Sequence, residues 1–157
     1  MTNREIKIAY QEFDSLNELN QEDLILAKAA IDATSRSYAP YSNFNVGAAL
    51  MYADGEIIQG SNQENAAYPS GLCAERTALF YASSRRPDTP IISLAIAAAQ
   101  NGKLCDIPAT PCGACRQVMA QYQTKGGRPM SVLLVGGKKI WKFASVDELL
   151  PLTFNSI

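Results

Sequence analysis

Three cysteines and one glutamate are the residues of this sequence best suited to metal chemistry. Cys112 and Cys115 lie three positions apart, directly after Pro111. Cys73 lies further upstream, and Glu75 follows it by two residues. Three thiolates can hold one zinc ion and leave a fourth position open for water, as in catalytic zinc sites. The carboxylate of Glu75 could then move the protons of that water.

The elements that would position these residues are helices that begin at the cysteines. Composition predicts one helix over 73–84 and another over about 112–123, opened by Pro111. Exposed backbone N–H groups and the helix dipole favour thiolates at helix starts and lower their pKa. Two helix N-termini that converge on one zinc ion would therefore form a coherent metal site.

Other interpretations of the cysteines stay open at this point. Free cysteines are often buried simply as small hydrophobic residues. Cys112 and Cys115 could also form a thioredoxin-like redox pair, but Cys73 would then have no role. A structural zinc site needs four protein ligands. The fourth cysteine, Cys105, lies in a predicted loop, and we expect it to be a loop or core thiol.

Composition narrows the class of protein. The chain has 157 residues, 47% of them hydrophobic, which suits one globular domain with a real core. Its net charge of −1 argues against a nucleic-acid partner, which would need a basic face. No apolar run approaches the ~20 residues of a membrane span, and the N-terminus lacks the hydrophobic core of a signal peptide. We therefore expect a cytoplasmic protein without a membrane partner.

Cysteine usage agrees with that location. Thiols stay reduced in the cytosol, where patterned cysteines indicate metal binding or catalysis more often than disulfides. The chain contains no histidine. Any metal site must therefore use Cys, Asp or Glu, and any general base should be a carboxylate.

The order of predicted elements indicates an α/β fold. A helix over about 20–37, with Asn20 as N-cap, should bury a stripe through Leu24, Ala27, Ile31 and Thr34 and leave Asp23 outside it. Strands are predicted over 44–52, 56–60, 91–99, 131–135 and 140–143, and a short helix over 146–150. We expect a three-layer α/β/α arrangement with a mixed sheet of about five strands.

The chain resembles the small, homotetrameric, zinc-dependent cytidine deaminases. The resemblance covers roughly residues 20–155 and rests on these segments: Tyr41-Ser42-Asn43-Phe44, 46–50, 62–68, Cys73-Ala74-Glu75-Arg76, 111–118, 149–151 and Phe154. Gln63 stands where the family usually has an apolar residue, and the segment between Cys73 and Cys112 is somewhat long. By this resemblance residues 1–157 form a single deaminase domain, with residues 1–15 as an N-terminal extension.

The resemblance implies an activity and a set of catalytic roles. The reaction would be hydrolytic deamination of cytidine, and of 2′-deoxycytidine, to uridine or deoxyuridine plus ammonia, in pyrimidine salvage. One Zn²⁺ per subunit would be held by Cys73, Cys112 and Cys115. Glu75 would shuttle protons from the activated water to N3 and to the leaving amine. Arg76 would offset the thiolate charge, unless it is an ordinary surface arginine of the helix.

The resemblance also implies a nucleoside site. Asn62 and Glu64, otherwise an ordinary polar loop, would bind ribose hydroxyls, the 3′-OH foremost. Phe44 would stack on the base, and Ala74 would add a further substrate contact. The remaining aromatic residues would reach the site of a neighbouring subunit, so that a homotetramer is part of the catalyst: Tyr41, Tyr68 and Phe154.

Two rival functions remain on the sequence alone. One is a deaminase of the same fold that acts on a modified or antibiotic nucleoside. The other is a non-catalytic zinc-binding module. Turnover of ordinary cytidine would exclude the second and argue against the first.

Overall fold

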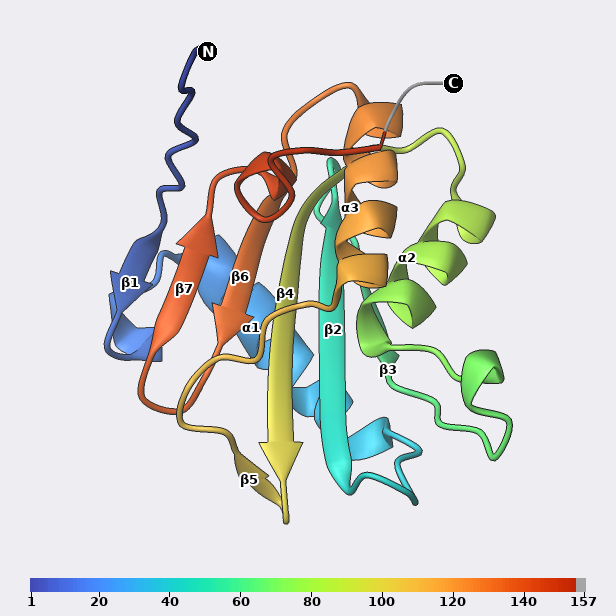
Figure 1. The fold of residues 1–157 in the computed structure, drawn as a ribbon. Helices are drawn as coiled ribbons and strands as arrows, with labels where there is room; N and C mark the ends of the chain where they lie inside the picture. The colour runs from blue at the N-terminus through green and yellow to red at the C-terminus, as the bar shows by residue number, and fades with distance from the viewer. Residues whose placement is uncertain (155–157) are drawn as a thin grey trace.

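The computed structural model describes residues 1–154 as a sheet covered by helices on both faces (Figure 1). The described strands number seven, in the order β1-β7-β6-β4-β2-β3, with β5 paired to β4. Their bounds are Gln11–Phe13, Phe44–Tyr52, Ile57–Ser61, Ile91–Gln100, Lys103–Leu104, Ser131–Val135 and Ile140–Phe143 for β1 to β7. Strands β4 and β6 pair in parallel and the other neighbours antiparallel, so the sheet is mixed.

The predicted α/β class and three layers are confirmed, but the sheet is larger than the expected five strands. The two additional strands, β1 and β5, contain three and two residues. Strands this short carry no readable alternation of apolar and polar residues, so sequence pattern could not find them. The helix expected over 146–150 is a 3₁₀ turn, Val146–Glu148, that begins at a capping box on Ser145.

Helix α1, Gln21–Ala33, covers one face of the sheet. Asn20 caps it as predicted, accepting a hydrogen bond of 2.9 Å from the N–H of Asp23. Of the predicted stripe, Ala27 is fully buried, while Leu24, Ile31 and Thr34 are partly buried, with Leu24 and Ile31 packed against the core. Asp23, predicted to lie outside the stripe, is buried together with Leu26, Ala30 and Ala33. Asp23 can lie inside because Lys142 on β7 donates to its carboxylate at 2.5 Å.

Small residues bring α1 very close to strand β2. A Cβ on Gly47 would lie 2.2 Å from the carbonyl oxygen of Ala30, which is far below a normal contact. The helix therefore needs glycine at this position of the strand. Alanines accordingly make up three of the five buried residues of α1, and Leu26 is the one large apolar side chain among them.

Helices α2, Ala74–Arg85, and α3, Gly113–Gly126, cover the opposite face. Leu79 and Met119 are fully buried between these helices and the sheet. Helix α2 lies on Gly60 of β3, where an added Cβ would be 2.6 Å from the backbone nitrogen of Ala78.

The sheet topology explains why the two helices begin side by side. Strand β2 is antiparallel to both β3 and β4, so β3 and β4 end at the edge of the sheet where β2 begins. The chain runs from the end of β3 into α2 and from the region after β4 into α3. Both helices therefore start at this edge, close to one another (Figure 1).

Strand β1 pairs with β7 and forms the edge of the sheet opposite β3. Glu12 accepts hydrogen bonds of 2.8 Å from both the Lys139 ammonium and the Trp141 indole. The ring of Tyr10 packs on those of Trp141 and Phe143. None of the helices described here is both long and apolar enough to cross a membrane.

Candidate metal centre and active site

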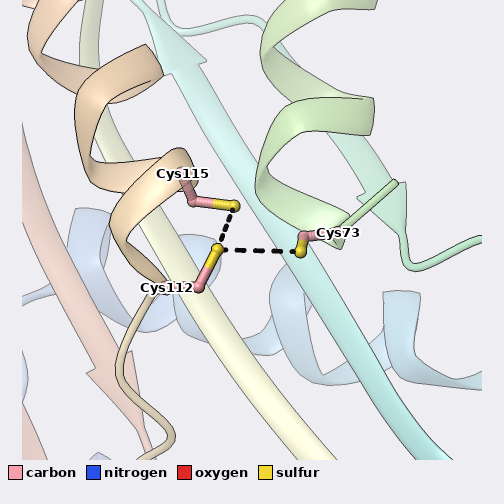
Figure 2. A group of neighbouring side chains, drawn as sticks. All are labelled: Cys73, Cys112 and Cys115. Carbon is pink, nitrogen blue, oxygen red and sulfur yellow. Dashed lines mark hydrogen bonds between the residues drawn. The ribbon is translucent and has the colours of Figure 1, made fainter. Parts of the chain in front are cut away.

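The sulfur atoms of Cys73, Cys112 and Cys115 form one cluster at the helix starts (Figure 2). The Cys73 and Cys112 sulfurs are 3.9 Å apart, and those of Cys112 and Cys115 are 3.4 Å apart. Zinc–sulfur bonds of about 2.3 Å in a tetrahedron place sulfurs about 3.8 Å apart. The residues present therefore fit a zinc ion with three sulfur ligands, and the predicted cofactor is Zn²⁺. The cluster does not include Cys105.

Each of the three sulfurs lies at the N-terminal end of a helix. Cys73 is the N-cap of α2 and Cys112 the N-cap of α3, while Cys115 lies in the first turn of α3. Backbone N–H groups and the positive end of each helix dipole therefore face the cluster.

The pKa values of Cys73 and Cys115 are shifted in opposite directions. Hydrogen bonds from the Cys115 thiol, and then from Arg76, lower the pKa of Cys73 to about 5. The pKa of Cys115 is raised, first because it donates to the Cys73 sulfur and then because it is buried. Three negative sulfurs cannot persist this close together without a cation. A cation held by all three sulfurs would compensate that charge.

Glu75 is buried beside this cluster, with 4% of its surface exposed. Burial raises the pKa of its carboxyl, and the negative charge of Cys73 raises it further. A carboxyl group with a raised pKa holds its proton more readily than an exposed one, which suits it to accept and return protons.

Arg76 contacts the cluster through Cys73. Its guanidinium donates to the Cys73 sulfur at 3.6 Å. The buried Nε of Arg76 has no hydrogen-bond partner among residues 1–154. Arg76 is thus half-buried and bonded to a predicted zinc ligand, and its role in offsetting thiolate charge stays a prediction.

A cavity of about 480 Å³ opens beside the sulfur cluster. We call it the site cavity, and the predicted residues that line it are Tyr41, Asn62, Glu64, Tyr68, Cys73 and Arg76. Its volume is in the range of sites for small ligands. The structure thus brings together a metal ligand, a cation and the polar pair expected to bind ribose.

Hydrogen bonds hold the polar pair in place. Asn62 accepts from the Val46 N–H at 2.8 Å and donates to the Phe44 carbonyl at 2.9 Å. Glu64 accepts from the backbone N–H groups of Tyr41 and Ser42 at 2.9 and 3.3 Å. These bonds hold both side chains against the start of β2.

The remaining predicted residues lie outside the lining of the site cavity. Phe44, the first residue of β2, is half-buried, and Ala74 is fully buried at the start of α2. Phe154 is 70% exposed, and its backbone carbonyl accepts from the Gln117 amide of α3 at 2.7 Å. Tyr41 and Tyr68, which do line the site cavity, meet edge to face, with ring centroids 6.0 Å apart.

Sequence reasoning gave no site role to five residues that line the site cavity: Ser42, Gln63, Asn65, Gly71 and Leu72. The Ser42 hydroxyl hydrogen-bonds Glu64, a residue 22 positions away, and no local sequence signal reports such a contact. Gln63 was noticed only as a departure from the family, and its amide donates to the Ser61 hydroxyl at 3.2 Å.

Comparison with known proteins agrees with this geometry. Residues 20–126 match the family model described as the cytidine and deoxycytidylate deaminase zinc-binding region. The chain is 48% identical over 134 residues to a cytidine deaminase of Halalkalibacterium halodurans, covering 84% of this chain and 93% of that protein. A cytidine deaminase of Sporosarcina psychrophila is 43% identical over 123 residues, with 78% and 84% covered.

Comparison with solved structures also finds cytidine deaminases. The crystal structure of a cytidine deaminase from Burkholderia pseudomallei superimposes with a TM-score of 0.69 at 41% identity, covering 83% of this chain and 97% of that one. A cytidine deaminase structure from Mycobacterium tuberculosis gives a TM-score of 0.65 at 30% identity, with 84% and 96% covered. This chain, with its three-sulfur cluster and buried glutamate, belongs to the cytidine and deoxycytidylate deaminase family.

Proposed function

We propose that this protein is a zinc-dependent hydrolase that deaminates cytidine and 2′-deoxycytidine to uridine and deoxyuridine with release of ammonia, in pyrimidine salvage. The observation that carries the proposal is the buried carboxylate of Glu75 beside the three-sulfur cluster. The relatives named above are cytidine deaminases that match most of the chain, which supports the same substrate class.

The chemistry divides between the metal and Glu75. A zinc ion on the three thiolates would act as a Lewis acid and lower the pKa of water at its open position. Glu75 takes a proton from the attacking water and delivers it to N3 of the base as the oxygen bonds to C4. It then carries the second proton to the amino group, which leaves as ammonia. One carboxylate can do both because its raised pKa suits both directions of transfer.

In this proposal Asn62 and Glu64 hydrogen-bond a ribose hydroxyl. Each carboxylate oxygen can accept about two hydrogen bonds, and an amide NH₂ can donate two. The backbone contacts described above use one N–H of Asn62, and the Ser42 hydroxyl uses one acceptor position of Glu64 Oε1. One N–H of Asn62 and one acceptor position of Glu64 are left, and together they complement a single hydroxyl. We assign the 3′-OH to this pair and base stacking to Phe44, with Ala74 as a further substrate contact.

The proposal includes the assembly and its setting. The chain acts as a single domain in the cytoplasm, with residues 1–15 as an N-terminal extension, and forms a homotetramer. Tyr41 and Tyr68 line the site cavity and are exposed, as is Phe154, so all three are available to a second subunit. Sedimentation of the zinc-loaded protein tests the tetramer, and a stable monomer with full activity would contradict it.

The first experiment mixes the zinc-loaded protein with cytidine and follows the pyrimidine ultraviolet absorbance, with the Glu75→Gln variant in parallel. We expect turnover by the unmodified protein and a loss of about 10²–10⁴-fold in the variant, the usual contribution of a general acid–base group. Zinc content should be equal in both. Zinc without turnover of cytidine by the unmodified protein would refute the proposal and direct the search to modified nucleosides or a zinc-binding module.

A further inference from the structure

The loop before β2 contacts Glu64 through two consecutive residues. Oε2 of Glu64 accepts from the N–H groups of Tyr41 and Ser42, and Oε1 accepts from the Ser42 hydroxyl. The two backbone contacts would persist whatever the side chain at position 42. Only the hydroxyl contact depends on serine, and it reaches the oxygen that has an acceptor position left for a ligand.

The same hydroxyl also contacts the start of the strand. The N–H of Phe44 donates to Ser42 Oγ at 3.1 Å. A hydroxyl has one proton. Because Oγ already accepts from Phe44, the natural direction for that proton is toward Glu64, whose ionised carboxylate can only accept. Ser42 therefore links the ribose-side carboxylate to the backbone of the residue assigned to the base.

The backbone conformation makes this double contact possible. Asn43, between the two bonded residues, has a φ of 54°, in the left-handed region. Asparagine tolerates that region better than most residues. The tight turn at Asn43 brings the Phe44 N–H back onto the Ser42 hydroxyl.

We propose that Ser42 is a positioning residue for ribose recognition. Its hydroxyl orients Oε1 of Glu64 and holds that oxygen at a fixed position relative to the backbone of Phe44. This inference rests on the proposed function, which assigns Glu64 to the 3′-OH. Hydrogen bonding from Ser42 is also the largest cause of the lowered pKa of Glu64, so the carboxylate stays ionised as an acceptor. Without the hydroxyl, Oε1 would turn away from the position that receives the substrate hydroxyl.

The test compares cytidine with 3′-deoxycytidine as substrates of the zinc-loaded protein. In Ser42→Ala, kcat/KM for cytidine should fall about tenfold, the factor for one hydrogen bond to a charged group. Most of the loss should appear in KM. The value for 3′-deoxycytidine should change less than about twofold, since that substrate has no hydroxyl for Glu64 to bind. Ser42→Thr keeps the hydroxyl and should restore discrimination.

Ser35→Ala is the matched control. Ser35 is an exposed serine of the 3₁₀ turn after α1, and its hydroxyl donates to the Asp32 carbonyl at 2.8 Å. It should leave both substrates unaffected. Ser42 is exposed, so its alanine variant should fold. Zinc content and the unfolding temperature check this directly.

The outcomes separate the positioning role from the proposed function. Equal losses on both substrates, or no loss on either, would overturn the role of Ser42. An unmodified protein that does not distinguish the two substrates would overturn the ribose assignment of Glu64 and this inference with it. An unmodified protein that does not turn over cytidine would refute the proposed function itself.

Discussion

Replacing Gly60 by alanine should displace helix α2 from the sheet and so weaken zinc binding. The new Cβ would lie 2.6 Å from the backbone nitrogen of Ala78 and 2.9 Å from the carbonyl oxygen of Ala74, both in α2. Ordinary contacts begin at 3.4 Å, so α2 must move about 0.8 Å away from β3. Backbone atoms cannot rotate aside as a flexible side chain would, so the helix has to shift.

The displaced helix carries Cys73, and zinc–sulfur distances tolerate only about ±0.2 Å. We expect zinc affinity to fall about 10–100-fold, the range seen when the support of a metal ligand is removed. Overpacking should also cost about 2 kcal/mol of unfolding free energy, which for a chain of this size lowers Tm by about 4–8 °C.

The assay is competition for zinc with a coloured chelator, well below the unfolding temperature, together with thermal unfolding. Two variants serve as controls. Gly47→Ala strains α1 on the opposite face and should destabilise the fold while zinc affinity stays normal. Gly126→Ala meets Pro90 at an ordinary 3.5 Å and should change little. Normal zinc affinity in Gly60→Ala, or an equal loss in Gly47→Ala, would refute the reasoning.

Three further predictions follow from the contacts described. Arg76→Ala removes a donor to the Cys73 sulfur and should lower zinc retention or turnover; a variant unchanged in both would show that the contact has no role. Chelation of zinc should lower Tm, because an ion bound only by the folded chain stabilises it; an unchanged Tm would argue against a bound ion.

The third concerns pH. Hydrogen bonds from Lys139 and then Trp141 lower the pKa of Glu12 below its ordinary 4.5, so docking of β1 should persist above pH 4.5 and weaken as acid protonates the folded carboxylate. Fluorescence of Trp141, the single tryptophan, should report that change, and Glu12→Gln should abolish its pH dependence. An acid transition of equal size in that variant would rule out Glu12 as its origin.

Much of the architecture could be read from local pattern. Strand β2 has the predicted bounds, and β4 extends the predicted run by one residue, because long apolar runs give a clear signal. The N-cap at Asn20 and the helix starts at Cys73 and Cys112 were also confirmed, since capping is a local interaction. Strands β1 and β5 were not predicted, because it is pairing with a neighbouring strand, rather than their own sequence, that makes them strands.

The sequence by itself determined the chemistry of this protein: three cysteines and one glutamate at a spacing that suits a catalytic zinc ion. Ligand type and helix-start position are local properties, so they are visible without a fold. Only the tertiary structure decided that Ser42 bonds Glu64, that Asp23 is buried against Lys142, and that Gly60 supports α2. Those contacts join residues far apart in the chain, and only the packing of helices on the sheet brings them together.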